Sequence, residues 1–331
     1  MDFVLDVGLA LAGLMLLVWG AEGFVRGAAG LARHLGVSTL VVGLTVVSLG
    51  TSAPELLVNL SAQYQGTPAM AFGNVVGSNI ANIGLVLGLS ALLMPLGVHS
   101  QVLRREYPLL LGASFLLLLL VVDGGLGLFD GLLLLLSAVA YTVWTVRTAG
   151  SGADDPYLAE AAEDVPEALS AGRAVMWIAI GLVGLILGSR LLVVGAADIA
   201  GFFGVSDLVI GLTVVAFGTS LPELAASLAA VAKREDDLVV GNVIGSCLLN
   251  TILVLGLPAI LGGLPAGSEA LWRDLPVMLA MTLVLGPIFL NGARNSYHIN
   301  RVEGGLLVVA YVVYIAWVFG FLPDPGGPGL G

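Results

Sequence analysis

Residues 43–55 read Gly43-Leu-Thr-Val-Val-Ser-Leu-Gly-Thr-Ser-Ala-Pro-Glu55, an apolar run that ends in a proline and a carboxylate. Pro54 interrupts a helix, because proline has no N–H to donate to the carbonyl of Gly50, four residues earlier. An ionisable side chain such as Glu55 is costly inside a membrane and usually marks an ion or substrate path. Irregular backbone at membrane depth persists only where it is buried in protein or lines a wet cavity. We therefore expect a broken helix over residues 50–52 whose free carbonyls and hydroxyls lie beside a charge.

The same pattern occurs a second time. Residues 211–223 read Gly211-Leu-Thr-Val-Val-Ala-Phe-Gly-Thr-Ser-Leu-Pro-Glu223, so the second glutamate follows the first by 168 residues (223 − 55). A second matched pair follows at the same offset: Gly73-Asn-Val-Val-Gly-Ser-Asn-Ile-Ala-Asn-Ile-Gly-Leu-Val-Leu-Gly88 and Gly241-Asn-Val-Ile-Gly-Ser-Cys-Leu-Leu-Asn-Thr-Ile-Leu-Val-Leu-Gly256. The chain therefore contains an internal repeat.

The composition is that of a polytopic membrane protein. Of 331 residues, 58% are hydrophobic and 11% charged, with a mean hydropathy of +1.03, whereas soluble domains carry about a quarter charged residues. The net charge of −11 argues against a nucleic-acid partner. The single cysteine, Cys247, excludes an internal disulfide, and its apolar surroundings predict a packed thiol. The first residues lack the basic region of a cleaved signal peptide, so the first apolar run is expected to remain as a span.

We predict an all-α polytopic membrane protein with ten transmembrane helices, because crossing the hydrocarbon takes about 20 apolar residues. The predicted spans cover residues 3–25, 37–63, 69–94, 107–122, 127–146, 174–196, 205–231, 238–262, 275–291 and 303–321. They form two five-helix repeats, one over 1–147 with its motifs at 43–88 and one over 173–331 with its motifs at 211–256. Residues 148–172, which are acidic and contain no lysine or arginine, are predicted to be a solvated cytoplasmic linker. A regulatory calcium site in this linker is the alternative, although its spacing is not that of an EF-hand.

Lysine and arginine predict the orientation, because they gather in cytoplasmic loops. If the N-terminus is outside, the inner loops contain Arg26, Arg33, Arg104, Arg105, Arg147, Arg173, Lys233, Arg234, Arg294 and Arg301. The outer side then contains only Arg273, and Arg190 lies within the sixth span. We therefore expect a plasma-membrane protein with both termini outside. Since the repeat offset contains five spans, an odd number, the second half must be inverted relative to the first, as in many secondary transporters.

The paired motifs supply oxygen donors. Ser78 and Asn82 are four residues apart and share one helix face, and Ser246 and Asn250 repeat that face. Carboxylates, hydroxyls, amides and carbonyls are hard ligands that suit calcium and sodium. The alternative is that such polar side chains only hydrogen-bond a neighbouring membrane helix, an interpretation that weakens when they recur together at one offset. Two further equivalent residues, Glu22 and Arg190, are opposite in charge, and we expect them near span ends and not among the ligands.

Both halves resemble the α-repeats of the sodium/calcium exchanger family, within the calcium/cation antiporter superfamily, of the bacterial and archaeal type. The signatures Gly-Thr-Ser-x-Pro-Glu and Gly-Asn-x-x-Gly-Ser each occur twice in the family's order. The resemblance implies one calcium site and several sodium sites that share ligands at the membrane midplane. By position, it implies calcium ligands at Glu55 and Glu223 with carbonyls near Thr51 and Thr219. The implied sodium ligands are Ser52, Ser78, Ser220 and Ser246 with carbonyls at Ser48 and Ala216, and Asn82 and Asn250 complete the set.

One position departs from the family pattern. Many exchangers of this family carry an aspartate where this chain has Asn250, so the charge of the central site, its ion count and any potassium dependence do not follow from the resemblance. The resemblance implies a sodium/calcium antiporter that works by alternating access and expels calcium, with no cofactor beyond the transported ions. Proton-coupled calcium efflux through the same two glutamates, and a passive calcium channel, remain alternatives. An intramembrane hydrolase is disfavoured, because His34, His99 and His298 lie outside the paired motifs and no His-Glu-x-x-His is present.

Overall fold

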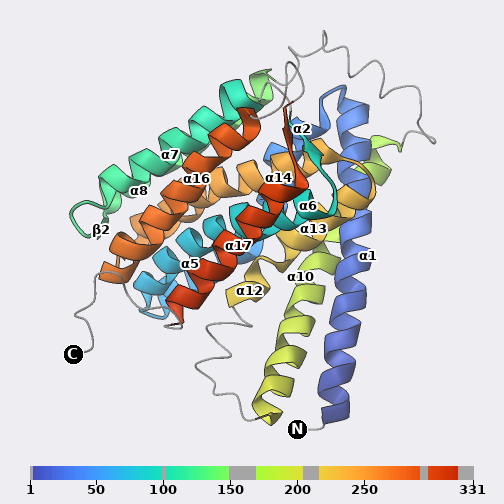
Figure 1. Ribbon diagram of the computed structural model, residues 1–331, viewed down its shortest axis with the longest axis horizontal. Coiled ribbons are helices and arrows are strands. Elements are labelled where there is room, and N and C mark those ends of the chain that lie inside the picture. Colours follow the sequence, from blue (N-terminus) through green and yellow to red (C-terminus); the bar gives the residue numbers. More distant parts are fainter. Residues whose placement is uncertain (1–2, 99–101, 149–168, 204–215, 291–296, 320–331) are drawn as a thin grey trace.

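The computed structural model describes residues 3–98, 102–148, 169–203, 216–290 and 297–319 (Figure 1). Two sequence-based predictions lie largely outside these residues: the acidic linker, described only at its ends, and the start of the second broken helix over 211–215. The described chain is almost entirely helical and includes short π-helical segments, named η below.

The helical segments of the two halves are as follows. The first half contains α1 (Phe3–Leu35), α2 (Thr39–Val42), η1 (Gly43–Val47), α3 (Ser48–Thr51), α4 (Ala53–Tyr64), α5 (Pro68–Ala81), η2 (Asn82–Leu87), α6 (Gly88–Leu93), η3 (Val102–Glu106), α7 (Tyr107–Leu120) and α8 (Leu128–Thr148). The second contains α10 (Ala171–Phe202), α12 (Ala216–Thr219), α13 (Leu221–Ala232), α14 (Asp236–Leu249), η6 (Asn250–Val254), α15 (Gly256–Gly262), η7 (Ala270–Asp274), α16 (Leu275–Leu290) and α17 (Arg301–Val318).

Eight helical stretches in the described part of the chain are long and apolar enough to cross a membrane. They confirm a polytopic membrane protein and coincide with eight of the predicted spans. The remaining two predictions, the fourth and the seventh, fall on α7, with 14 residues, and α13, with 12 residues. The residues that precede α12 lie outside the described ranges. The total of ten spans therefore stays a prediction.

The internal repeat reappears in the boundaries of the elements. Adding 168 to the first and last residues of α3, α4 and α5 gives the first and last residues of α12, α13 and α14. The same offset carries the first residue of η2 to that of η6, and the first residue of η3 to that of η7. The breaks between helical segments therefore recur at the same 168-residue offset as the helices.

Two short antiparallel ribbons join the halves. In one, β1 (Leu96–Gly97) pairs with β4 (His298–Ile299), and in the other β2 (Gly125–Leu126) pairs with β3 (Leu264–Pro265). Each ribbon therefore takes one strand from each half of the chain. The β1 strand packs against α14 and its equivalent β3 packs against α5, as expected if a twofold-like relation exchanges the halves. The ribbon of β2 closes one end of the bundle (Figure 1).

The centre of the molecule is formed by the equivalent spans Pro68–Leu93 and Asp236–Gly262, the two most buried of the eight candidates. Both are apolar on nearly every face, which is the pattern of a helix surrounded by protein. Their residues Phe72, Ile80, Val243 and Ile244 have no exposed surface. These spans carry the Gly-Asn-x-x-Gly-Ser motifs, so the motifs are buried at the core.

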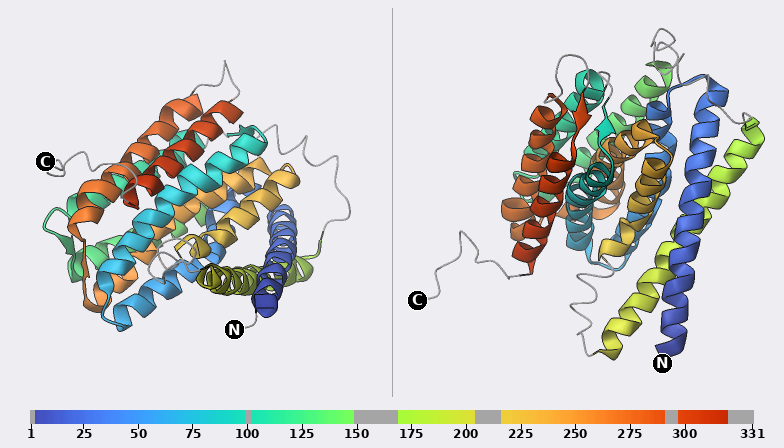
Figure 2. Two further views of the ribbon diagram at one scale, coloured as in Figure 1. Left: turned by 60° about the horizontal axis from the view of Figure 1, so that its bottom comes forward. Right: turned by 45° about the vertical axis from the view of Figure 1, so that its right-hand side comes forward.

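The long helices α1 and α10 pack side by side and stand apart from much of the bundle (Figure 2). Their contact is made by glycines at seven-residue spacing on both helices: Gly13, Gly20 and Gly27 on α1, and Gly181, Gly188 and Gly195 on α10. A Cβ atom added at Gly20 would lie 2.7 Å from the backbone of Gly184, and one at Gly27 would lie 2.6 Å from the backbone nitrogen of Ile178. Small residues of this kind let membrane helices approach closely enough for backbone contact.

We predict that Gly20→Ala destabilises the protein, because the added methyl group meets a backbone that cannot move aside. Overpacking of this kind costs about 1–3 kcal/mol. The matched control is Gly8→Ala on the same helix, where an added Cβ has nothing within 4 Å. Thermal unfolding in detergent should show a lower melting temperature for Gly20→Ala only. Equal melting temperatures for the two variants would show that the glycine contacts do not hold α1 against α10.

Candidate functional site

The break in each motif helix is confined to one residue. Helix α3 ends at Thr51 and α4 begins at Ala53, which leaves Ser52 with φ −80° and ψ 2°, in the bridge region of backbone space. Ser220 has nearly the same geometry, φ −89° and ψ 2°, between α12 and α13. The predicted interruption is therefore confirmed for the first motif, but it is narrower than residues 50–52. The proline lies in the first turn of the following helix, where its missing N–H is tolerated.

The carbonyls around the break are less free than the sequence suggested. The Ser48 carbonyl accepts the Ser52 N–H at 3.0 Å, and the Ser52 carbonyl accepts the Leu56 N–H at 3.1 Å. Each carbonyl oxygen has a second lone pair, so these bonds leave it able to bind a cation. Pro54 has no N–H to donate to the Gly50 carbonyl, which the Ser52 N–H approaches instead.

Nearly all of the predicted site side chains are buried. Those with at most 4% of their surface exposed are Ser48, Thr51, Ser52, Glu55, Ser78, Asn82, Ser220, Glu223, Ser246 and Asn250. Thr219 is partly buried, and Ala216 begins α12. The structure thus places the polar motif residues inside the bundle and not on its lipid-facing surface.

The two glutamates come from opposite halves, and the residues around them meet, because Ser52, three residues before Glu55, bonds to Glu223. Glu223 Oε1 accepts the Ser52 hydroxyl at 3.4 Å, which joins α13 to the break before α4. Glu223 Oε2 and both carboxylate oxygens of Glu55 are buried and have no hydrogen-bond partner among the described residues. Burying a carboxylate without a partner is expensive unless a cation compensates the charge. The pair therefore has the charge and the free oxygens that a divalent cation requires.

A hydrogen-bonded group around Asn242 links the same helices. The Thr51 hydroxyl lies 3.1 Å from Asn242 Oδ1, and Asn242 Nδ2 donates to Ser227 Oγ at 3.0 Å and to the Glu223 carbonyl at 3.3 Å. In the first half, the equivalent Asn74 donates to Asn59 Oδ1 at 2.9 Å. Each motif asparagine thus ties the central helix to the helix that carries the glutamate.

A second group lies where α5 meets α14, and sequence analysis did not single out two of its members, Asn79 and Thr251. Asn79 and Cys247 are equivalent by the 168-residue offset, and they face each other: Asn79 Nδ2 donates to the Cys247 carbonyl at 3.4 Å, and Cys247 Sγ lies 3.8 Å from the Asn79 carbonyl. Asn79 also contacts Thr251 and Asn250. The repeat could not reveal this group, because asparagine in one half faces cysteine in the other. The packed thiol predicted for Cys247 is confirmed, since it is 1% exposed.

Glycines bring the second-half motif against the first-half broken helix. A Cβ atom at Gly245 would lie 2.6 Å from Ser48 Oγ and 2.8 Å from the Leu44 carbonyl. One at Gly241 would lie 2.8 Å from the Leu40 carbonyl. Backbone contact at these glycines places α14 directly against η1 and α3, the segments that precede the break.

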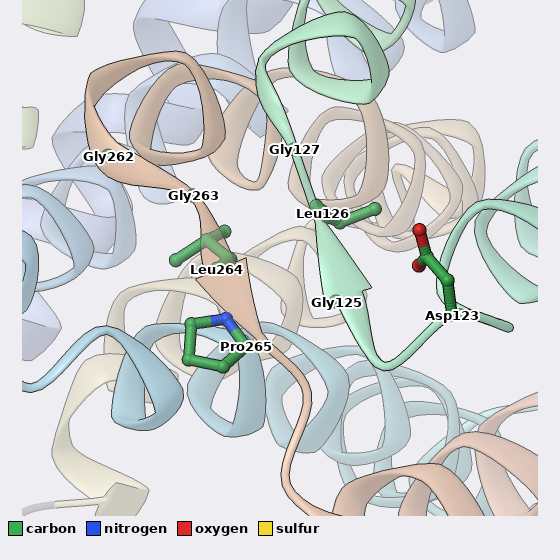
Figure 3. A pocket seen from close by; sticks show the side chains of 8 residues that line it. All are labelled: Asp123, Gly125, Leu126, Gly127, Gly262, Gly263, Leu264 and Pro265. Carbon is green, nitrogen blue, oxygen red and sulfur yellow. The ribbon is translucent and has the colours of Figure 1, made fainter.

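A surface depression lies at the ribbon of β2 and β3 (Figure 3). Asp123 is the one ionisable side chain among its lining residues, and none of them belongs to the paired motifs. Among the described residues, no group of three or more histidine, cysteine, aspartate or glutamate side chains could hold a metal ion. The candidate site is therefore the buried glutamate pair together with its neutral oxygen donors.

Comparison with known proteins identifies a matching family. Residues 5–147 and 173–320 match the family described as "Sodium/calcium exchanger protein". The chain is 44% identical over 305 residues to the putative antiporter CaxA of Alkalimonas amylolytica, covering 92% of this chain and 95% of that protein. It is 31% identical to the sodium/calcium exchanger MaX1 of Methanosarcina acetivorans, covering 93% of this chain and 97% of that protein.

The fold is similar to solved structures of the sodium–calcium exchanger NCX_Mj. Against the structure soaked with zero Na+ and Ca2+, the TM-score is 0.83 at 36% identity, covering 95% of this chain and 99% of that chain. These relatives are ion transporters and not enzymes. Because the family match spans both halves and the fold is shared over nearly the whole length, this chain belongs to the sodium/calcium exchanger family.

Proposed function

We propose that this protein exchanges sodium for calcium across the plasma membrane by alternating access and thereby expels calcium. The observation that carries this proposal is the pair of buried glutamates, Glu55 and Glu223, one from each half, whose carboxylate oxygens are mostly unpaired. An enclosed pair of carboxylates without basic partners is stable only when its charge is neutralised by bound cations or by protons.

The donors around this pair match the coordination that calcium prefers. Calcium takes six to eight oxygen ligands, typically carboxylates and carbonyls. We propose that Glu55 and Glu223 bind calcium together with the carbonyls near Thr51 and Thr219. We propose sodium ligands at Ser52, Ser78, Ser220 and Ser246, with the carbonyls of Ser48 and Ala216 and the amides of Asn82 and Asn250.

Exchange follows from shared ligands. One calcium neutralises two carboxylates, and sodium ions that occupy the same oxygens must displace it. A cation can bias the transporter toward one conformation only through its different affinity for the two conformations. We propose that the site can change the side to which it opens only while cations occupy it. After calcium is released on one side, sodium must then bind before the site can open to the other side.

Protons are the alternative driving ion, because two protons would also neutralise Glu55 and Glu223. The asparagine at position 250 concerns a separate question, whether potassium takes part.

A site with two carboxylates balances fewer cations than one with a further aspartate. We therefore propose sodium coupling without a role for potassium.

We further propose a domain organisation with five-helix repeats over 1–147 and 173–331, joined by a cytoplasmic linker over 148–172. In this arrangement both termini lie outside the cell. The excess of basic residues in the proposed inner loops supports it.

The first prediction concerns the glutamates. Glu55→Gln or Glu223→Gln keeps the side-chain volume and removes one site charge, so calcium transport in proteoliposomes should be abolished. Without added cations, thermal stability should stay equal or rise, because repulsion between the two carboxylates is relieved. Stabilisation by calcium, which follows from selective binding to the folded state, should disappear.

The matched control for these variants is Glu269→Gln, whose side chain is 81% exposed and makes only a long ion pair with Arg273. It should transport calcium at the wild-type rate. Wild-type transport by both single-site glutamine variants would refute the assignment of the site.

The second prediction identifies the driving ion. Vesicles with sodium, potassium or pH gradients imposed singly should show calcium movement driven by sodium alone, without added potassium. Calcium movement that follows the pH gradient and ignores sodium would support the proton-coupled alternative. Flux that needs no counter-ion gradient at all would indicate a channel.

The third prediction concerns topology. His34 and Gln65 are both exposed and lie at opposite ends of the second predicted span. In a Cys247→Ala background that still transports calcium, His34→Cys should be protected from a membrane-impermeant thiol reagent in intact cells, whereas Gln65→Cys should react. Labelling of His34→Cys alone would reverse the proposed orientation.

A further inference from the structure

The amide of Asn250 has one end bound and one end free. Asn250 begins η6 and its side chain is fully buried. Its Nδ2 donates to Asn79 Oδ1 at 3.2 Å, whereas its Oδ1 is buried and has no partner among the described residues. An amide is nearly symmetric in shape, so what decides which end faces a cation is its hydrogen bonding.

The orientation of the Asn79 amide is set by the groups that contact its nitrogen, on the side away from Asn250. The Thr251 hydroxyl donates to the Cys247 carbonyl at 2.8 Å, which uses its only proton. Thr251 Oγ1 can therefore only accept from Asn79, whose Nδ2 lies 3.0 Å away. The Cys247 carbonyl at 3.4 Å and Met278 Sδ at 3.6 Å are also acceptors. Asn79 must accordingly point its nitrogen at this acceptor group and its oxygen at Asn250.

We propose that Asn79 is a positioning residue, which holds the Asn250 amide with its carbonyl oxygen toward the transported cation. This inference rests on the proposed function, because it assigns a role at the same ion site. The chain of donors runs from Asn250 to Asn79, to Thr251 and on to the Cys247 carbonyl, and it leaves one orientation for each amide. With Asn79 absent, Asn250 could turn over and present its NH2 group, whose partial positive charge repels a cation.

The two halves differ in this respect. Asn82 is the equivalent of Asn250, but Cys247 stands at the position equivalent to Asn79, and Ile83 at the position equivalent to Thr251 (251 − 168). A cysteine and an isoleucine cannot reproduce the relay of amide and hydroxyl. In the described residues Asn82 therefore has no amide or hydroxyl partner, and only the Cys247 thiol, a weak hydrogen-bonding group, lies beside it. The relay therefore orients only the second-half amide, which makes the ion site asymmetric despite its repeated motifs.

A double-mutant cycle with Asn79→Ala and Asn250→Asp tests this role. A carboxyl group at position 250 presents an oxygen to the cation whichever way it turns, and a proton on its other oxygen would meet Asn79 Oδ1, so it needs no partner to choose its orientation. Calcium and sodium binding to the purified full-length protein would be measured by thermal stabilisation, and KM and kcat by vesicle flux. We expect Asn79→Ala to weaken cation binding about tenfold in the wild-type background, with the effect mainly on KM. In the Asn250→Asp background the same change should alter binding less than about threefold.

A second variant keeps the inference testable if Asn79→Ala fails to fold. Thr251→Val keeps the shape of the side chain and removes the nearest of the three acceptors that orient Asn79, so it should weaken binding in the same direction by a smaller factor. The control is Ser114→Ala, because the Ser114 hydroxyl is buried and donates to Leu110 of its own helix at 2.8 Å. It should leave cation binding unchanged.

Equal weakening by Asn79→Ala in both backgrounds would show a packing role and overturn the inference. So would wild-type binding in both Asn79→Ala and Thr251→Val. A folded wild-type protein that gains no stability from calcium or sodium would instead refute the proposed function itself, and this inference with it.

Discussion

Two buried glutamates of like charge, one from each half, form the constraint that explains much of this architecture. Glu55 and Glu223 lie at the starts of equivalent helices, α4 and α13, and neither has a basic partner in the described residues. In a medium of low dielectric, such charges are tolerated only with nearby compensation by ions or hydrogen bonds. The Ser52 hydroxyl and the Asn242 amide both bond to Glu223, and the central helices are buried on nearly every face.

Close backbone approach serves two different purposes in the fold. Between α1 and α10, regularly spaced glycines form an extended contact between two long helices. At Gly241 and Gly245, glycines instead bring α14 against the residues before Ser52, so that polar groups from both halves fall within hydrogen-bonding distance. The first contact joins helices that carry little of the polar cluster, whereas the second builds the cluster itself.

Much of the site could be predicted from the sequence, because the repeat marked the same residues twice. The glutamates, the motif serines and Asn82 and Asn250 are all buried as expected, although their role as ion ligands stays a proposal. The relay through Asn79 and Thr251 could not be found this way, because it occurs in one half only. The glycine contact of α1 with α10 did have a sequence signal, the seven-residue spacing of Gly13, Gly20 and Gly27. The ribbons had none, since strands of two residues are too short to show alternation.

The exchange of strands between halves has a consequence for biosynthesis. Gly97 pairs with His298, which lies 201 residues further along the chain (298 − 97). At synthesis rates of roughly 5–20 residues per second, β1 leaves the ribosome about 10–40 seconds before its partner strand exists. During that interval Asn79 lacks Asn250 and Thr251, and Ser52 lacks Glu223. Until then the first half has an unpaired strand edge and unpaired polar groups. We expect this interval of synthesis to be the one in which the nascent chain is prone to mispairing and degradation.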